Sequence, residues 1–296
     1  MSWMKELDGN VKVLQYNIPG THDCVTQYVQ LPHISRCQNM SIYEQLNLGI
    51  RALDIRVMFK GERLVMIHGI AKAFNTPNKK GGQMDLEDVL SQCYRFLGEN
   101  PTETIIFQFK NDIGKFHKNN MKSFDNLFRT YIKGNEDRWF LENRIPKLDE
   151  ARGKIVLIRR CWCYGRAEYT PYNTGIDFSR WFEQDVAVPE PLTLYTSGVY
   201  DDKREEFIIQ DRFKYKPEER WHECILPFLE TMGPFCGTYV IDYLSTAGGF
   251  KGPEENAKYI NAKFMEYELK KGYYYGTIYC DFPTKELVDK IVNSNF

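Results

Sequence analysis

The fold of this chain is decided by three short stretches near its N-terminus: Ile-Pro-Gly-Thr-His-Asp at residues 18–23, Leu-Asp-Ile-Arg at 53–56 and Met-Ile-His-Gly at 66–69. In each of them an apolar, strand-like run ends in polar residues. The ends of parallel strands in a barrel meet at one rim, so these stretches predict a shared pocket there. The side chains expected in that pocket are His22, Asp23, Asp54, Arg56 and His68.

These residue types suit phosphate ester chemistry without a metal. One imidazole can take a proton from a nucleophilic hydroxyl, the other can give a proton to the leaving oxygen, and a guanidinium can hold the phosphate by two hydrogen bonds. Asp54 and Arg56 alternate with apolar neighbours and therefore point to the same side of one strand. A plain salt bridge between them is the alternative interpretation.

Length and composition favour a globular α/β protein. The chain has 296 residues, of which 43% are hydrophobic and 15% aromatic, enough for a sizeable core. Its 39 basic and 40 acidic residues nearly cancel, so the overall charge gives no reason to expect nucleic acid as a partner. No apolar run is long enough for a transmembrane helix, and the first residues do not form a signal peptide.

The eight cysteines show no Cys-x-x-Cys spacing, which argues against a zinc site or a thioredoxin-type motif. Several lie inside apolar periodic segments, where a free cysteine behaves as a small core residue. We expect reduced thiols, which fit a cytosolic or anaerobic setting better than a disulfide scaffold.

Alternating strands and helices are expected along the whole chain. The predicted strands are residues 11–18, 50–59, 64–70, 104–110, 154–160, 207–213, 238–244 and 276–282. Amphipathic helices are predicted over 84–97 and 254–271. This order indicates one (β/α) barrel domain spanning residues 1–296.

Two features depart from a regular barrel. Only a short turn, Lys60-Gly61-Glu62, separates the second and third predicted strands, so they either pair antiparallel or belong to an irregular barrel. Residues 164–196 are rich in Tyr, Pro and Asn with little periodicity, which predicts a long functional loop.

These motifs together resemble the bacterial phosphatidylinositol-specific phospholipase C (PI-PLC X-domain) family. The resemblance extends over nearly the whole chain and rests on the stretches at 18–23, 49–56 and 68–69, together with Asn-Pro-Thr-Glu-Thr-Ile-Ile at 100–106 and Ala-Arg-Gly-Lys-Ile-Val-Leu at 151–157. It implies a distorted, incompletely closed TIM barrel. It also implies cleavage of phosphatidylinositol into diacylglycerol and inositol 1,2-cyclic phosphate.

The resemblance also implies a role for each catalytic residue. His22 would be the general base on the inositol 2-hydroxyl, with Asp281 orienting it. His68 would be the general acid for the diacylglycerol oxygen, with Asp23 as its partner. Arg56 would contact the phosphate, and Asp54 would steady the cluster.

Further strand ends match the family's inositol-binding positions, namely Lys110, Arg160 and Asp211. A solvated strand terminus is the alternative interpretation for Lys110 and Arg160. The position where the family has a stacking Tyr is Phe213 here, which keeps the stacking surface but loses the phenolic hydroxyl.

No metal and no other cofactor is expected. Calcium-dependent relatives have acidic ligands where this chain has Arg56 and Lys110, and these two cations would repel a bound ion. The same residues argue against a metal-dependent glycerophosphodiester phosphodiesterase. A catalytically silent phosphoinositide-binding barrel is a further alternative, although none of the five central residues is lost.

The family docks on membranes through an apolar rim, which corresponds here to residues 25–34 and 247–253. The predicted contact residues are Tyr28, Leu31 and Phe250, unless these side chains pack onto the barrel instead. Phosphatidylinositol in membranes is the expected partner, glycosylphosphatidylinositol anchors are a further candidate substrate, and we expect a monomer. Relatives are commonly secreted, so we expect a secreted or peripheral membrane protein; the cysteine content favours a cytoplasmic alternative.

Overall fold

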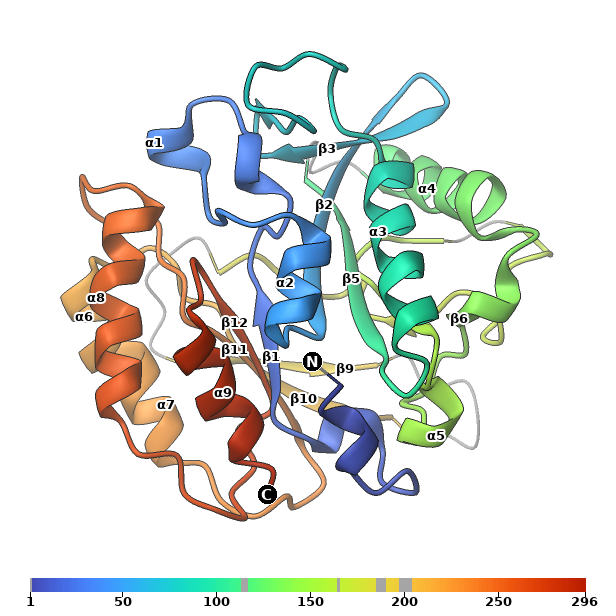
Figure 1. Cartoon of the computed structure of the whole chain (residues 1–296). Coiled ribbons are helices and arrows are strands. Elements are labelled where there is room, and N and C mark those ends of the chain that lie inside the picture. Colours follow the sequence, from blue (N-terminus) through green and yellow to red (C-terminus); the bar gives the residue numbers. More distant parts are fainter. Residues whose placement is uncertain (1, 113–116, 164–165, 185–189, 197–203) are drawn as a thin grey trace.

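The computed structural model describes residues 2–112, 117–163, 166–184, 190–196 and 204–296. Its core is a curved sheet of 12 strands surrounded by helices (Figure 1). The strands are β1 (Ile18–Thr21), β2 (Ala52–Lys60), β3 (Arg63–His68), β4 (Ala71–Lys72), β5 (Ile105–Asn111), β6 (Trp139–Phe140), β7 (Ile155–Arg159), β8 (Ile176–Asp177), β9 (Leu192–Tyr195), β10 (Glu206–Gln210), β11 (Tyr239–Tyr243) and β12 (Thr277–Cys280).

The strand order is that of a barrel left open on one side. The path runs β6-β7-β5-β2-β1-β12-β11-β10-β9, and every pair along it is parallel except β10 with β9. Within the described ranges, no hydrogen-bonded ladder joins β9 to β6 or β8. The predicted distorted, incompletely closed TIM barrel is thereby confirmed.

One predicted strand is wrong. Residues 11–18 do not form a strand, because Val13–Gln15 is a 3₁₀ turn and β1 begins only at Ile18. Val13 and Leu14 are buried, and the Val13 amide donates to the Pro146 carbonyl at 2.9 Å. This segment therefore uses its apolar residues to pack beside the barrel rather than to extend the sheet.

The short junction after β2 is an antiparallel hairpin. β2 pairs antiparallel with β3, and Lys60 lies opposite Arg63 across the turn. The expected alternative of an antiparallel pair is therefore correct. The predicted loop at 164–196 contains two short strands, β8 and β9, and its residues 164–165 and 185–189 lie outside the described residues.

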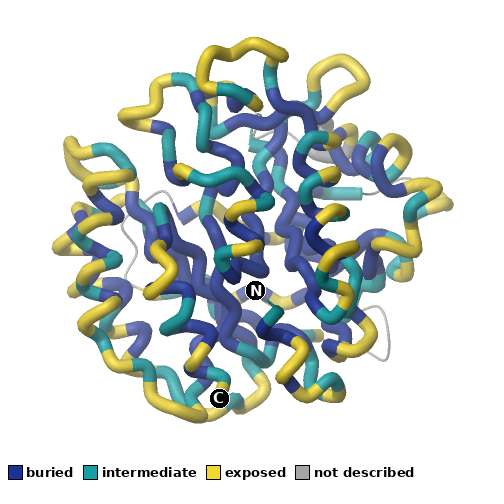
Figure 2. The backbone as a smooth tube through the Cα atoms, viewed as in Figure 1, coloured by how far each residue is buried: buried dark blue, intermediate teal, exposed yellow. Residues whose placement is uncertain are grey.

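The helices lie outside the strands. They are α1 (Pro32–Ser35), α2 (Ile42–Leu48), α3 (Leu86–Glu99), α4 (His117–Asn126), α5 (Leu148–Ala151), α6 (Pro217–Glu219), α7 (Leu226–Glu230), α8 (Pro253–Glu266) and α9 (Lys285–Asn293). Figure 2 shows buried strands inside and exposed helix turns outside. None of the helices in the described part of the chain has the length and apolarity to cross a bilayer.

Helix α3 shows why the sequence pattern succeeds locally. A capping box formed by Asp85 and Asp88 begins the helix, and the apolar residues at helical spacing face the sheet. Helix α8 ends at Glu266, before the predicted residue 271, because Tyr267 has extended backbone angles and its hydroxyl donates to the Leu229 carbonyl at 3.2 Å.

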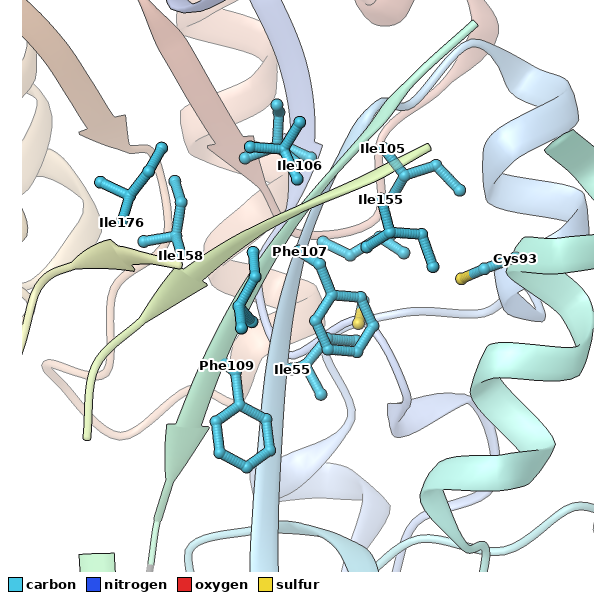
Figure 3. Packing of buried hydrophobic residues seen from close by; sticks show 14 of the residues in the cluster. Ile55, Cys93, Ile105, Ile106, Phe107, Phe109, Ile155, Ile158 and Ile176 are labelled. Atoms are coloured by element: carbon cyan, nitrogen blue, oxygen red, sulfur yellow. The ribbon is translucent and has the colours of Figure 1, made fainter. Parts of the chain in front are cut away.

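The central strands are buried on both faces, as parallel strands in a barrel must be. Along β5 the side chains alternate: Ile105, Phe107 and Phe109 share one face, with Ile105 and Phe107 toward α3, and Ile106 points to the other face (Figure 3). Cys93 of α3 packs against the first face as a small apolar residue (Figure 3). This packing fixes the strand ends, from which the polar side chains described below project.

Candidate active site

The register of two neighbouring strands brings His22 and Asp281 together. Thr21, the last residue of β1, lies beside Cys280, the last residue of β12. The next residue on each strand is therefore His22 and Asp281, and their Nδ1 and Oδ1 atoms are 2.8 Å apart. Asp23 follows with a left-handed φ of 43°, which turns its side chain back toward the same space.

Three nitrogen atoms converge on the buried carboxylate of Asp23. Its Oδ2 lies 3.1 Å from His22 Nε2, 3.3 Å from His68 Nε2 and 3.1 Å from Arg56 Nη1. The two imidazole rings are 6.2 Å apart, centroid to centroid. The structure thus brings together the two histidines, the arginine and the carboxylate that the sequence predicted.

The Nδ1 atom of each histidine faces a hydrogen-bond acceptor. His22 Nδ1 faces Asp281, and His68 Nδ1 lies 2.8 Å from the Ser35 carbonyl oxygen. We assign the Nδ1 proton to both rings on this basis, because a carboxylate or a carbonyl needs a donor. Nε2 is then the atom of each ring that is available for proton transfer.

The charges around His22 favour its protonated form. Burial alone would lower the pKa of His22, but the carboxylates of Asp281 and Asp23 outweigh it and raise the pKa to about 9. Burial would raise the pKa of Asp54, yet the Arg56 guanidinium lowers it to about 2. Arg56 Nη2 lies 2.9 Å from Asp54 Oδ2, so this carboxylate holds the guanidinium in place.

A pocket of about 290 Å³ opens in front of these groups. Of the predicted residues it is lined by His22, Arg56, His68, Lys110, Asp211, Phe213, Phe250 and Asp281. Asp23 and Asp54 are fully buried beneath it. A ring bearing several hydroxyls could be held by the polar groups on its walls.

Lys110 and Arg160 share an acidic partner. Lys110 Nζ lies 3.0 Å from Asp112 and 2.6 Å from Glu183, and Arg160 Nη2 is 3.9 Å from Glu183. The Arg160 guanidinium stacks 3.7 Å above the centroid of the Trp181 ring. Neither cation is a freely solvated strand terminus.

Asp211 is buried, lines the pocket and lies just beyond the end of β10. Burial raises its pKa, against the effect of Arg160 and other nearby cations. Phe213 lines the pocket two residues further on, where a stacking ring was predicted.

The predicted membrane-contact residues differ in exposure. Leu31 is 56% exposed and Phe250 is fully exposed at 107%, whereas Tyr28 is half-buried and its carbonyl accepts from the Phe74 amide. Ile34, which was not singled out, is 66% exposed. The apolar tip at this rim thus consists of Leu31, Ile34 and Phe250.

The sequence reasoning missed three residues of the site: Asp112, Glu183 and Cys37. Asp112 also accepts from the Gly69 amide at 2.6 Å, which ties the end of β5 to the turn after His68. Asp112 lies two residues after Lys110, as Arg56 lies two residues after Asp54, so both members of each pair face the same side of a strand. This pattern could have predicted Asp112 as a site residue. Glu183 lies in the aperiodic loop, and Cys37 in a short segment before α2, where no pattern pointed to them.

Comparison with known proteins finds relatives among phosphatidylinositol-cleaving enzymes. The sequence profile of the family "Phosphatidylinositol-specific phospholipase C, X domain" matches residues 15–161. A 1-phosphatidylinositol phosphodiesterase of Listeria monocytogenes is 31% identical over 167 residues, which are 53% of this chain and 47% of that protein. One from Staphylococcus aureus (strain Newman) is 27% identical over 281 residues, which cover 91% of this chain and 82% of the relative.

Solved structures share the fold. A phosphatidylinositol-specific phospholipase C from Staphylococcus aureus superimposes with a TM-score of 0.78 at 19% identity, covering 100% of this chain and 97% of its own. The Listeria monocytogenes enzyme gives 0.70 at 21% identity, with coverage of 100% and 98%. The open barrel, the profile match and these relatives agree: in sequence and in fold the chain resembles the phosphatidylinositol-specific phospholipase C family.

Proposed function

We propose that this protein cleaves phosphatidylinositol into diacylglycerol and inositol 1,2-cyclic phosphate without a metal. The observation that carries this proposal is the convergence of His22 Nε2, His68 Nε2 and Arg56 Nη1 on one carboxylate oxygen at the floor of an open pocket. It supplies two proton-transfer groups and one phosphate-binding group on the same side of a substrate.

In this mechanism the base is the deprotonated form of His22, which is the minor form at neutral pH because its pKa is raised to about 9. Its Nε2 takes the proton of the inositol 2-hydroxyl, and the freed oxygen attacks the phosphorus. The bond from phosphorus to the diacylglycerol oxygen breaks, and His68 donates its proton to that oxygen. Asp281 stabilises the imidazolium that forms on His22, as a carboxylate at Nδ1 does in other acid–base sites. Arg56 binds the phosphate oxygens, while Asp54 keeps its guanidinium in position.

Lys110, Arg160, Asp211 and Phe213 would bind the inositol ring. Glu183 lies between Lys110 and Arg160. We therefore propose that its carboxylate accepts hydrogen bonds from the inositol hydroxyls that these two cations bind. We propose that Leu31, Ile34 and Phe250 insert into the headgroup region, so that the protein acts as a secreted or peripheral enzyme on a membrane surface.

Arg56 and Lys110 are the reason to propose a reaction without calcium. Both are held by carboxylates at the pocket, Arg56 by Asp54 and Lys110 by Asp112. A hard cation that relies on those carboxylates would have to compete with two resident positive charges.

The test is incubation with phosphatidylinositol in excess EDTA, followed by phosphorus NMR of the products. We expect inositol 1,2-cyclic phosphate as the first product and none from the His22→Ala variant. Direct release of an inositol monophosphate, or activity that requires an added divalent ion, would favour the metal-dependent phosphodiesterase alternative. Binding of phosphatidylinositol without any product would favour the catalytically silent barrel.

A further inference from the structure

We propose that the active site also binds zinc, through His22, Asp23 and Cys37, and that zinc thereby reversibly blocks the enzyme. These three residues each offer a ligand atom, and the three atoms lie within 4.8 Å of one another. Imidazole nitrogen, carboxylate oxygen and thiolate sulfur are the ligands that zinc takes in proteins. The inhibition of the enzyme by zinc rests on the proposed function. The binding of zinc does not, because it can be measured without turnover.

His22 is already oriented as a zinc ligand would be. Its Nδ1 faces Asp281 at 2.8 Å, so Nε2 is the atom left to bind a metal. A carboxylate on the far nitrogen is the usual support of a zinc-bound histidine, because it fixes the ring and raises the basicity of the ligating nitrogen.

Asp23 provides an anionic ligand that lacks ordinary hydrogen bonds. Among the described residues neither of its buried carboxylate oxygens has a hydrogen-bond partner, although Oδ2 forms ion pairs with Arg56 and the two histidines. A cation in contact with Oδ1 would therefore break no hydrogen bond, and one in contact with Oδ2 would share that oxygen with Arg56.

Cys37 completes the set from a different part of the chain. It is buried and lines the same pocket, and the hydrogen-bonding contacts of its Sγ with described residues are long, 3.9 Å to the Ser35 carbonyl and 3.9 Å to His68 Nδ1. Three protein ligands at a pocket wall leave a fourth position open to a water or a phosphate oxygen.

Charge balance distinguishes zinc from calcium at this site. Zn²⁺ binds imidazole nitrogen and thiolate sulfur, and binding to Cys37 would release the thiol proton, so part of the ion's charge next to Arg56 would be offset. Calcium binds oxygen ligands and would not displace this proton, so its whole charge would be added to that of Arg56. The expectation of a metal-independent reaction therefore stands together with inhibition by a softer ion.

Bound zinc would stop catalysis by occupying His22 Nε2, the atom proposed to take the substrate proton. Activity on phosphatidylinositol is measured across a zinc titration in a chelator-buffered solution, with each variant compared with its own activity in EDTA. We expect zinc to inhibit the wild type and EDTA to restore it. Cys37→Ala should shift the inhibiting zinc concentration upward by about 10- to 100-fold or more, since loss of even a supporting residue has this effect.

Cys236 offers the matched control, because its thiol is exposed and could bind zinc adventitiously. Cys236→Ser should be as sensitive to zinc as the wild type. Equal sensitivity of Cys37→Ala and the wild type, or loss of sensitivity in Cys236→Ser, would overturn the assignment.

A second readout is independent of activity. Cobalt(II) added to the wild type should give a sulfur-to-cobalt charge-transfer band that zinc abolishes and that is absent from Cys37→Ala. If Cys37→Ala does not fold, Cys37→Ser serves in its place. If folded wild-type protein with cobalt(II) lacks the sulfur-to-cobalt band, the proposed metal site is refuted. This outcome does not depend on which substrate the enzyme cleaves.

Discussion

The carboxylate of Asp281 should control the protonation of His22, and Asp281→Asn tests this directly. The substitution keeps the side-chain shape and removes the charge that lies 2.8 Å from His22 Nδ1. Burial alone would lower the pKa of His22, and of the two carboxylates that raise it to about 9, Asp281 contributes more than Asp23. The variant should therefore have a His22 that loses its proton at lower pH.

The magnitude follows from the size of the perturbation. A rise in the pKa of His22 from 6.5 to about 9 corresponds to roughly 3 kcal/mol of differential interaction. Of the interaction free energy that the two carboxylates contribute, Asp281 should supply more than Asp23. We therefore expect the pKa of His22 in Asp281→Asn to fall by at least about one unit, or ~1.4 kcal/mol.

The direct assay is a pH titration of the histidine ring signals by NMR, with the His22 signal assigned from its absence in His22→Ala. Asp289→Asn is the matched control, because Asp289 pairs with Lys285 on the solvent-facing side of α9. An unchanged His22 midpoint in Asp281→Asn would refute the electrostatic role given to this carboxylate. Turnover should also fall by about 10²- to 10⁴-fold, since the base loses its orienting group.

The same shift has a consequence for stability. A histidine whose pKa is raised by folding stabilises the folded state at pH values below its unfolded pKa, and this stabilisation is lost as the pH rises through the folded pKa. For His22 the window runs from 6.5 to about 9. Urea unfolding across this window should show a declining free energy of unfolding in the wild type and a smaller decline in Asp281→Asn.

Three further changes probe other parts of the structure. His68→Ala should lose about 10²- to 10⁴-fold in turnover of phosphatidylinositol but regain much of it on an inositol phosphate ester with a phenolate-like leaving group, since that oxygen needs no acid; equal losses on both substrates would argue against His68 as the acid. Phe250→Ala should weaken sedimentation with phosphatidylinositol vesicles, and it should reduce cleavage of vesicle-bound substrate more than cleavage of a soluble one; unaltered vesicle binding would remove Phe250 from the membrane contact. Glu103→Gln should lower the free energy of unfolding in urea by about 3–5 kcal/mol, because it leaves the buried Arg51 guanidinium, 2.7 Å away, without its counter-charge; a loss no larger than that of exposed Glu99→Gln would contradict this.

Much of the site could be predicted because its residues follow directly from strand ends. His22, Asp54, Arg56 and His68 sit in or just after apolar runs whose length and alternation indicate β-structure, and parallel pairing then brings them to one rim. Asp281 could be assigned only through the family resemblance, because nothing local connects it with His22 across 259 positions.

The remainder depends on contacts that leave no local pattern. The residues before Ile18 look like a strand because Val13 and Leu14 are apolar, but burial at the side of a barrel requires the same residue types as burial in a sheet. Glu183 reaches the pocket from an aperiodic loop, and its position depends on Lys110 and Arg160, which are distant in sequence. Cys37 has no partner at metal-binding spacing, since its neighbours at the site, His22 and Asp23, come directly after β1.

The open side of the barrel leaves strand edges that could pair with another chain. The edge along β7 is covered by β6 and β8, which have only two residues each, and the other edge is β9, with four residues. Short edge strands offer a foreign strand too few backbone donors and acceptors to hold it. In concentrated solution, these short strands should therefore protect the protein against edge-to-edge aggregation. A substitution that lengthens β9 should increase such aggregation.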